Sequence, residues 1–328
     1  MRRFPSLLVC GVTAAACSLS GTGEFGGERY VNLERAATSS PAESGAARGN
    51  HAIKTVFLIL MENRNWSAIK GSASAPYLNG LLSRGAHAEA YRDNASAVHP
   101  SEPNYIWLEA GDNLGITDDG PPEANHRATR KHLTALLDDA AIPWRAYQEG
   151  ISGLECPLRA QGLFDPKHCP MLYFDDVTDR RTPLSERCVA HVRPYGELER
   201  DLQRDAVAAY NFITPDLCHD MHNSGGCSTP DSVKNGDVWL AAEVPRILAS
   251  ASYQRGGAVF ITWDESDAGE NPVGMIVLST FAKPGYANAI RYTHSSMLRT
   301  AQEIFSVQPF LRDAADSVSL GDLFTTYP

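Results

Sequence analysis

The sequence lacks an apolar run long enough to cross a membrane, and it has few basic residues. A transmembrane helix needs about 20 consecutive apolar residues, and no stretch of the chain approaches that length. Lysine and arginine number 29 against 39 aspartates and glutamates, for a net charge of -10. Because nucleic acids are bound through clustered Lys and Arg, no nucleic-acid partner is expected. The 43% hydrophobic content is that of an ordinary globular protein.

The sequence also lacks any CxxC pair, which argues against common zinc modules. Cys218 and Cys227 flank the short loop "CHDMHNSGGC", and a disulfide there would hold the loop rigid. Cys156 with Cys188 is the second expected pair, which leaves Cys169 unpaired. Zinc binding by "CHDMH" is the competing interpretation. Disulfides are favoured because the spacing matches no common zinc module, and they persist in exported proteins.

The first 17 residues are predicted to be an export signal. Arg2 and Arg3 precede an apolar stretch, and small residues precede Cys17. "AAAC" resembles a bacterial lipoprotein cleavage box, in which Cys17 would carry a lipid anchor, the only membrane attachment expected; cleavage without lipidation is the alternative. Residues 18–50 are rich in Gly, Ser, Ala and Glu without periodicity and are predicted to form a disordered tether. Residues 51–328 are predicted to form a single catalytic domain.

Short apolar segments alternate with helical patterns along this domain. Such near-continuous runs, rich in Val, Ile and Phe, predict buried parallel strands. The alternation predicts an α/β fold with a mostly parallel sheet covered on both faces. Residues 150–195 are predicted to be an irregular lid or side wall. The predicted strands are 55–61, 208–214, 258–263 and 273–279, and the predicted helices lie within 75–85, 130–142, 237–253 and 293–305.

Acidic and amide side chains follow three of the predicted strands. In parallel sheets ligands bind beyond the carboxyl ends of the strands, so these groups are expected to meet. Adjacent buried carboxylates repel each other and lose hydration, and a divalent cation would relieve both costs. Oxygen ligands suit Mg, Ca or Mn, and zinc less well. The alternative is that these acids lie in solvated loops and cap the following helices. The groups are Glu62 and Asn63, Asp216 with His219, Asp220 and His222, and Asp264 and Glu265.

The stretch "HPSEPNY", residues 99–105, offers a nucleophile. Pro100 and Pro103 fix the backbone around Ser101, and a short helix can begin after Pro103. A serine at a helix start lies among free N–H groups, which favour a phosphate oxygen. Metal coordination would lower the pKa of the Ser101 hydroxyl. Asn104 could donate to phosphoryl oxygens, and His99 is a further substrate-binding candidate. The alternative is that Ser101 is only a helix cap.

Three histidines are further candidates. His219 and His222 lie on either side of Asp220 in the loop between the two cysteines and are candidate ligands, substrate contacts or proton donors. His294 lies at the start of a predicted helix, where ring and helix N-terminus could both face an anion; alternatively it packs on Tyr292. Asp237 is expected to cap its own helix.

Taken together, these segments resemble the bacterial phosphoesterase family of secreted acid phosphatases and phospholipases C, in the alkaline phosphatase superfamily. The resemblance implies a three-layer α/β/α sandwich and a single divalent metal ion. The implied metal ligands are Glu62, Asn63, Ser101, Asp264 and Glu265. The matching segments are "LILMENRNW", "HPSEPNY", "NFITPDLCHDMH", "GDVWLAAEVPRIL", "VFITWDES" and "THSSMLRTAQEIF", in this order from about residue 54 to 307.

The resemblance also implies roles for the other residues. Ser101 would become phosphorylated, Asn104, His222 and His294 would contact the phosphoryl group or protonate the leaving oxygen, and Asp220 would orient a histidine. Arg64 and Trp66 would brace the Glu62–Asn63 pair.

The resulting prediction is a phosphomonoesterase acting on a small phosphorylated substrate or a phospholipid head group. Phosphodiesterase or phospholipase C activity is the first alternative, although the phospholipases typically carry extra domains. A non-catalytic surface protein that binds phosphorylated ligands is the second.

Overall fold

The central strand of the protein, β1 (Thr55–Met61), is formed by the apolar run "TVFLILM", and all its residues after Thr55 are buried. The computed structural model describes residues 51–94, 99–222, 225–267, 269 and 271–328, all within one compact unit, Ser44–Pro328. The predicted export signal, with Cys17, and the predicted tether lie outside the described residues.

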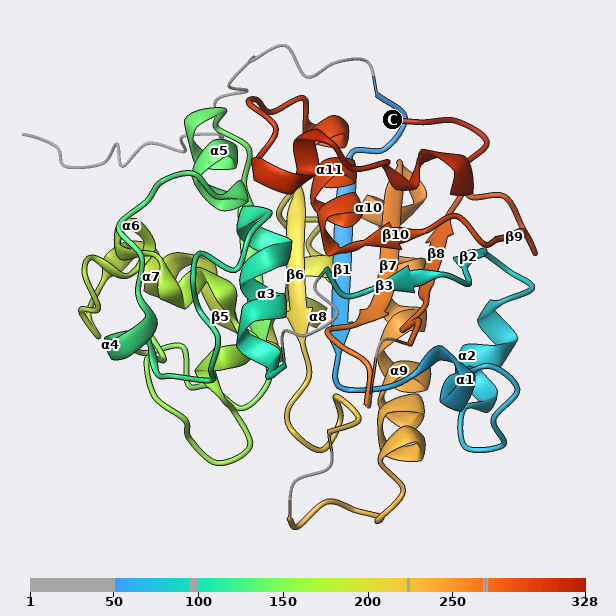
Figure 1. The fold of residues 1–328 in the computed structure, drawn as a ribbon, viewed down its shortest axis with the longest axis horizontal. Helices are drawn as coiled ribbons and strands as arrows, with labels where there is room; N and C mark the ends of the chain where they lie inside the picture. The colour runs from blue at the N-terminus through green and yellow to red at the C-terminus, as the bar shows by residue number, and fades with distance from the viewer. Residues whose placement is uncertain (1–50, 95–98, 223–224, 268, 270) are drawn as a thin grey trace, which may run out of the picture. The chain divides into compact units, whose positions relative to one another are not determined.

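One large sheet is built around β1. Its strand order is β5-β4-β6-β1-β7-β8-β2-β9, and every pairing is parallel except those that β8 makes with β7 and β2. Figure 1 shows β1 in the middle of this sheet, with β6 on one side and β7 on the other. A separate pair joins β3 to β10. The strands are β2 (Ala86–Ala88), β3 (Tyr91–Arg92), β4 (Trp144–Gln148), β5 (Val192–Pro194), β6 (Tyr210–Thr214), β7 (Gly257–Trp263), β8 (Met275–Ser279), β9 (Ala287–Asn288) and β10 (Tyr292–Thr293).

Helices cover the sheet to give a three-layer α/β/α sandwich, as predicted. Helices α3 and α11 pack against each other and α5, and Figure 1 shows α11 in front of the central strands. Helix α9 packs with α2, α8 and α10. The helices are α1 (Trp66–Ile69), α2 (Pro76–Leu81), α3 (Ser101–Ala110), α4 (Pro122–Asn125), α5 (Leu133–Asp139), α6 (Asp175–Thr178), α7 (Glu186–His191), α8 (Glu197–Gln203), α9 (Ser232–Ala249), α10 (Ala251–Gln254) and α11 (His294–Phe305), with 3-10 turns η1 (Pro166–His168), η2 (Pro170–Tyr173), η3 (Arg312–Ala315) and η4 (Leu320–Leu323).

The four predicted strands are confirmed as β1, β6, β7 and β8, but β8 is antiparallel, contrary to prediction. Strand β4, "WRAYQ", was not predicted because Arg145 interrupts its apolar pattern. The expected irregular stretch 150–195 contains short helices and β5, the edge strand of the sheet. Among the described residues, no helix combines the length and apolarity that a membrane span requires.

Contrary to the prediction, Asp237 does not cap its own helix. Helix α9 begins earlier, and Asp231 caps it by accepting the N–H of Lys234. The buried carboxylate of Asp237 instead accepts the N–H groups of Tyr77 at 3.0 Å and Leu78 at 2.8 Å, at the start of α2. Asp237 therefore joins two helices by satisfying backbone donors that α2 leaves free.

Both predicted disulfides are confirmed. Cys156 bonds to Cys188 and Cys218 bonds to Cys227, with Cα–Cα distances of 5.4 and 5.2 Å. Cys169 is a buried free thiol. The Cys218–Cys227 bridge closes the loop that carries Asp220 and thereby restrains the chain beyond β6.

Candidate active site

Four buried carboxyl groups lie where the central strands end. Glu62 follows β1, and Asp264 follows β7; because Met61 and Trp263 are partners in the β1–β7 register, these acids leave the sheet side by side. Glu265 comes next along the chain, and Asp220 lies in the loop after β6. The exposed fraction is 0% for Glu62, Asp220 and Asp264 and 2% for Glu265.

Asn63 connects the β1 and β7 ends through its backbone and its amide. Its backbone N–H donates to Asp264 Oδ1 at 2.9 Å, and its Nδ2 donates to Glu265 Oε1 at 3.2 Å. The residue has a φ of 38°, on the left-handed side of the map, which Asn tolerates better than most residues. The Glu-Asn ending of β1 therefore organises both acids that follow β7.

Helix α3 places two hydroxyl groups on Glu62. Ser101, the first residue of α3, donates from Oγ to Glu62 Oε2 at 3.1 Å. Tyr105 lies one turn later on the same face and donates from its hydroxyl to Glu62 Oε1 at 2.7 Å. Ser101 is 2% exposed. Helix α3 therefore begins three residues before the predicted start after Pro103, and the Ser101 hydroxyl contacts a carboxylate of the cluster.

Asn104 and His99 contact the outer carboxyl group. Asn104 Nδ2 donates to Glu265 Oε2 at 3.0 Å, and His99 Nδ1 lies 2.7 Å from the same oxygen. Both were predicted to bind substrate, and the structure places both against Glu265.

The buried acids hold raised pKa values because burial disfavours their charged forms. Burial raises the pKa of Glu62 and Asp220 well above the usual values, and nearby charges, Asp264 among them, add to both shifts. Burial raises the pKa of Asp264 to about 6. Burial and the charge of Asp264 raise the pKa of Glu265 to about 9. Raised pKa values of this kind indicate that little positive charge surrounds these acids to stabilise their ionised forms.

The cluster has the donor atoms that a divalent cation requires. Asp264 Oδ2 and Asn63 Oδ1 are buried oxygens that accept no hydrogen bond from the described residues. A buried acceptor without a partner is costly in free energy, and carboxylate, amide and hydroxyl oxygens are the ligands that hard cations prefer. The five predicted metal ligands therefore come together in a form that fits a metal ion.

His168 belongs to the site and was not predicted. It lies in η1, fully buried, with Nε2 3.1 Å from Glu62 Oε1 and Nδ1 3.6 Å from Asp220 Oδ2. Its ring stacks on Tyr105 with a centroid distance of 5.1 Å. Burial, then the charges of Lys167 and His222, lower its pKa. No strand directly precedes His168, so its sequence context carries no strand-end signal.

His294 starts α11 as predicted, but its ring contacts protein groups. Its Nδ1 lies 3.0 Å from the Tyr91 hydroxyl, and its Nε2 contacts the backbone oxygen of Asp264. Burial lowers the pKa of His294 to about 4. A neutral ring can donate to the Asp264 carbonyl while it accepts from Tyr91. These contacts make His294 a support for Asp264, whereas the predicted phosphoryl contact or proton donation would require the ring to leave that carbonyl.

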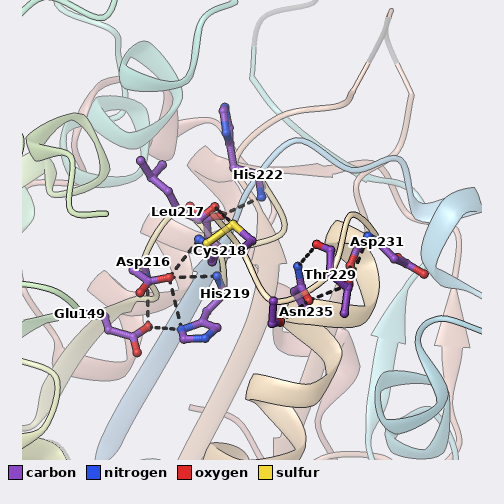
Figure 2. The surroundings of a disulfide bond; sticks show 12 residues. Glu149, Asp216, Leu217, Cys218, His219, His222, Thr229, Asp231 and Asn235 are labelled. Carbon is purple, nitrogen blue, oxygen red and sulfur yellow. Dashed lines mark hydrogen bonds and ion pairs between the residues drawn. A yellow bond between two sulfur atoms is a disulfide. The ribbon is translucent and has the colours of Figure 1, made fainter. Parts of the chain in front are cut away.

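The His219 side chain contacts Glu149 and Asp216, which are not part of the carboxyl cluster. Figure 2 shows its ring beside Glu149 and Asp216, with His222 pointing elsewhere. His219 Nδ1 lies 2.9 Å from Glu149 Oε2 and 3.3 Å from Asp216 Oδ1. Glu149, which was not predicted, comes just after β4. These three residues offer ligand atoms within 4.8 Å of one another, and His219 is bonded to Glu149 through Nδ1 and to Asp216 through its backbone N–H. The predicted substrate contact of His219 does not follow from this placement.

Asp220 lies between two histidines. Its Oδ1 accepts the backbone N–H of His222 at 2.7 Å, while Oδ2 faces His168. The histidine ring that Asp220 approaches is therefore His168. Burial, followed by the charges of Lys167 and Arg64, lowers the pKa of His222.

Arg64 and Trp66, which follow Asn63 closely along the chain, tie this segment to its surroundings. Arg64 donates to the Asn63 carbonyl at 2.7 Å and to the Met221 carbonyl at 2.8 Å, and also contacts Ser232. Trp66 donates from Nε1 to Glu89 at 3.0 Å. The loops that follow β1 and β6 are thus held together by one guanidinium group.

Comparisons with known proteins agree with this geometry. The chain is 26% identical to phosphatidylinositol-3-phosphatase of Mycobacterium tuberculosis over 308 residues, which cover 93% of this chain and 90% of that protein. It is 26% identical to a probable acid phosphatase of Kluyveromyces lactis over 66% of this chain and 48% of that protein, so it spans about half the yeast relative.

A solved structure from Vibrio parahaemolyticus, in the alkaline phosphatase superfamily, shares the fold. Its TM-score is 0.57, with 10% sequence identity, over 83% of this chain and 72% of that one. The Phosphoesterase family matches residues 74–308, a range that includes Ser101, the loop after β6 and the acids after β7. The arrangement of these residues and this match lead to one conclusion: the chain belongs to the Phosphoesterase family.

Proposed function

We propose that the chain is a metal-dependent phosphomonoesterase in which Ser101 is the nucleophile. The family and its phosphatase relatives make it a hydrolase of phosphoric ester bonds. The observation that carries the finer proposal is the hydroxyl of Ser101 at the N-terminus of α3, hydrogen-bonded to Glu62 within a buried carboxyl cluster short of positive charge.

The residues that would hold the metal ion are the predicted set. A bound divalent ion would supply the missing positive charge and lower the pKa of a hydroxyl in its coordination shell. Two of its ligand atoms would be the oxygens that lack hydrogen-bond partners among the described residues. The set is Glu62, Asn63, Ser101, Asp264 and Glu265.

In the first step Ser101 Oγ attacks phosphorus as the bond from phosphorus to the alcohol oxygen breaks. The hydroxyl proton moves along the existing hydrogen bond to Glu62 Oε2. The N-terminus of α3 directs the positive end of its dipole toward the phosphoryl oxygens. This charge stabilisation is the main contribution a protein makes to phosphoryl transfer.

The leaving oxygen takes a proton from His222. In the second step the oxygen of a water molecule bonds to phosphorus, the Ser101 Oγ–phosphorus bond breaks, and phosphate departs. The water proton restores His222, and Glu62 returns the proton to Ser101. Because the pKa of His222 is lowered, its protonated form is abundant only at acidic pH, which agrees with acid phosphatase activity.

The monoester preference and the place of action are part of the proposal. The Mycobacterium tuberculosis relative is named a phosphatidylinositol-3-phosphatase, which supports a phosphorylated head group as one substrate class. Two disulfides support export to an oxidising compartment. Lipidation at Cys17 stays a prediction.

The test compares Ser101→Ala with wild type in three measurements. We expect loss of p-nitrophenyl phosphate hydrolysis, loss of the phosphorylated peptide seen by mass spectrometry after acid quenching, and stoichiometric divalent metal in the wild type that chelation removes together with activity. Ser83→Ala is the control, because this exposed hydroxyl bonds only to the nearby Gly80 carbonyl. Full activity in Ser101→Ala would disprove the nucleophile assignment, and faster turnover of bis-p-nitrophenyl phosphate would favour a phosphodiesterase.

A further inference from the structure

Lys167 lies at the site and has no role in the mechanism above. It directly precedes His168 in η1, and its side chain is 14% exposed. Its Nζ donates to Asp119 Oδ2 at 2.7 Å, while Asp119 Oδ1 accepts the N–H of Glu102 at 3.0 Å. Glu102 is the residue after Ser101 in α3. One carboxylate therefore bridges the Lys167 ammonium to the first turn of the helix that carries the nucleophile.

The charge of Lys167 reaches the centre of the site from this position. Burial raises the pKa values of Glu62, Asp220 and Glu265, and in each case the positive charge of Lys167 opposes the shift. The three carboxyl groups come from different strand ends. A single ammonium that acts on all three lies near them.

Arg64, the other cation close to the site, differs from Lys167 in its contacts. Both terminal nitrogens of its guanidinium are used to hold loops, because they donate to the carbonyls of Asn63 and Met221 and contact Ser232. Among the described residues, the Lys167 ammonium donates to Asp119 alone. An ammonium has three N–H donors, which leaves two for a ligand.

The surrounding charge makes this ammonium important for the choice of substrate. Asp119 and Asp93, like Asp264, raise the pKa of Glu265 and so add negative charge near the site. A phosphomonoester carries nearly two negative charges at pH 7, since its second pKa is about 6, whereas a phosphodiester carries one. The extra charge of the monoester would be repelled by the acids unless a cation meets it.

We propose that Lys167 is the residue that selects phosphomonoesters over phosphodiesters, by donating to a non-bridging phosphoryl oxygen that a diester does not leave free and charged. The inference rests on the proposed function. Asp119 holds the ammonium in place when no substrate is bound and lets it turn toward the dianion. Lys167 touches substrate and takes no part in proton transfer.

The experiment measures kcat/KM at pH 7 for p-nitrophenyl phosphate and bis-p-nitrophenyl phosphate in wild type, Lys167→Gln and Lys167→Arg. We expect Lys167→Gln to lower monoester kcat/KM by about 10- to 100-fold, the range for a charge-assisted hydrogen bond, and to change diester kcat/KM less than about threefold. Lys167→Arg keeps the charge and restores most monoester turnover. Inhibition by inorganic phosphate weakens in parallel in Lys167→Gln, which reports binding without turnover.

Lys283→Gln is the matched control. Lys283 also pairs with one aspartate, Asp322, at 3.2 Å, on a part of the surface made by other elements. Its loss should leave both substrates and phosphate inhibition unchanged. Melting temperatures of all variants identify any that fail to fold. If Lys167→Gln fails to fold, the monoester and diester kcat/KM values of Lys167→Arg, each relative to wild type, decide the comparison.

The outcomes separate this proposal from the one it rests on. An equal fall for both esters in Lys167→Gln, or no fall for either, overturns the selectivity role. Failure of Lys167→Arg to recover monoester turnover overturns it as well. If the wild type hydrolyses neither ester in the presence of divalent metal, the proposed phosphatase function fails, while weaker phosphate binding to Lys167→Gln still supports the contact.

Discussion

Gly274 and Gly71 offer a controlled measurement of how tightly the chain packs around Trp66. Both glycines have a φ of +79°, so alanine pays the same backbone strain at either position, about 1–2 kcal/mol. At Gly71 an added Cβ would find no atom within 4 Å. At Gly274 it would lie 2.2 Å from Cε3 and 2.4 Å from Cδ2 of the Trp66 ring.

Trp66 cannot move aside easily. Its backbone N–H donates to Pro272 at 2.7 Å, its Nε1 donates to Glu89, and its ring is 6.2 Å from that of Trp263. Overpacking of this kind costs a further 1–3 kcal/mol, roughly. We therefore expect Gly71→Ala to lower the free energy of unfolding by about 1–2 kcal/mol and Gly274→Ala by about 2–5 kcal/mol, the sum of both terms.

The free energy of unfolding of both variants can be measured by urea denaturation, with tryptophan fluorescence as the signal. At about 2–4 °C per kcal/mol for a domain of this size, the melting temperature of Gly274→Ala should fall by roughly 4–20 °C. Equal losses of unfolding free energy in the two variants would mean that the Trp66 ring moves aside at no cost in free energy. The packing argument would then be wrong. A larger loss in Gly71→Ala would contradict the backbone term as well.

Two further predictions concern buried acids and a histidine away from the site. Burial alone would lower the pKa of His132, but hydrogen bonds and charges from Asp176 and Glu109 outweigh it and raise the pKa. The resulting stabilisation is complete below the unfolded pKa of about 6.5 and is lost as pH rises through the higher folded value. The difference in unfolding free energy between wild type and His132→Gln should therefore shrink from pH 6 to pH 9; a constant difference would refute this. Asp237→Ala removes the acceptor for two N–H groups at the start of α2 and should cost about 1–2 kcal/mol by the same urea assay, whereas Asp237→Asn, which keeps one acceptor oxygen, should cost less; no loss in Asp237→Ala would show that water replaces the carboxylate.

The sheet centre was predictable because its strands are continuous apolar runs. Strand β1 was predicted at its observed bounds and β7 to within one residue. The direction of β8 was not predictable, since a buried strand has the same apolar pattern in either direction. Strand β4 was missed because the half-buried Arg145 interrupts its apolar pattern.

The site shows the same division between local and tertiary information. Glu62 and Asp264 were predictable because each directly follows a strand, and the β1–β7 register then brings them together. His168 reaches Glu62 through a tertiary fold of the 150–195 region that no local pattern indicates. Asp237 has the sequence context of a helix cap, and only the packing of α9 against α2 reveals which helix it caps.

The candidate active site gathers residues from positions 62 to 294, which are carried there by several separate elements of the sheet and its cover. No contiguous fragment of the polypeptide contains a usable subset, so catalysis can begin only after the long-range pairings of β1, β6 and β7 have formed. During refolding, enzymatic turnover should therefore recover later than secondary structure. Its recovery would report on the last stage of folding.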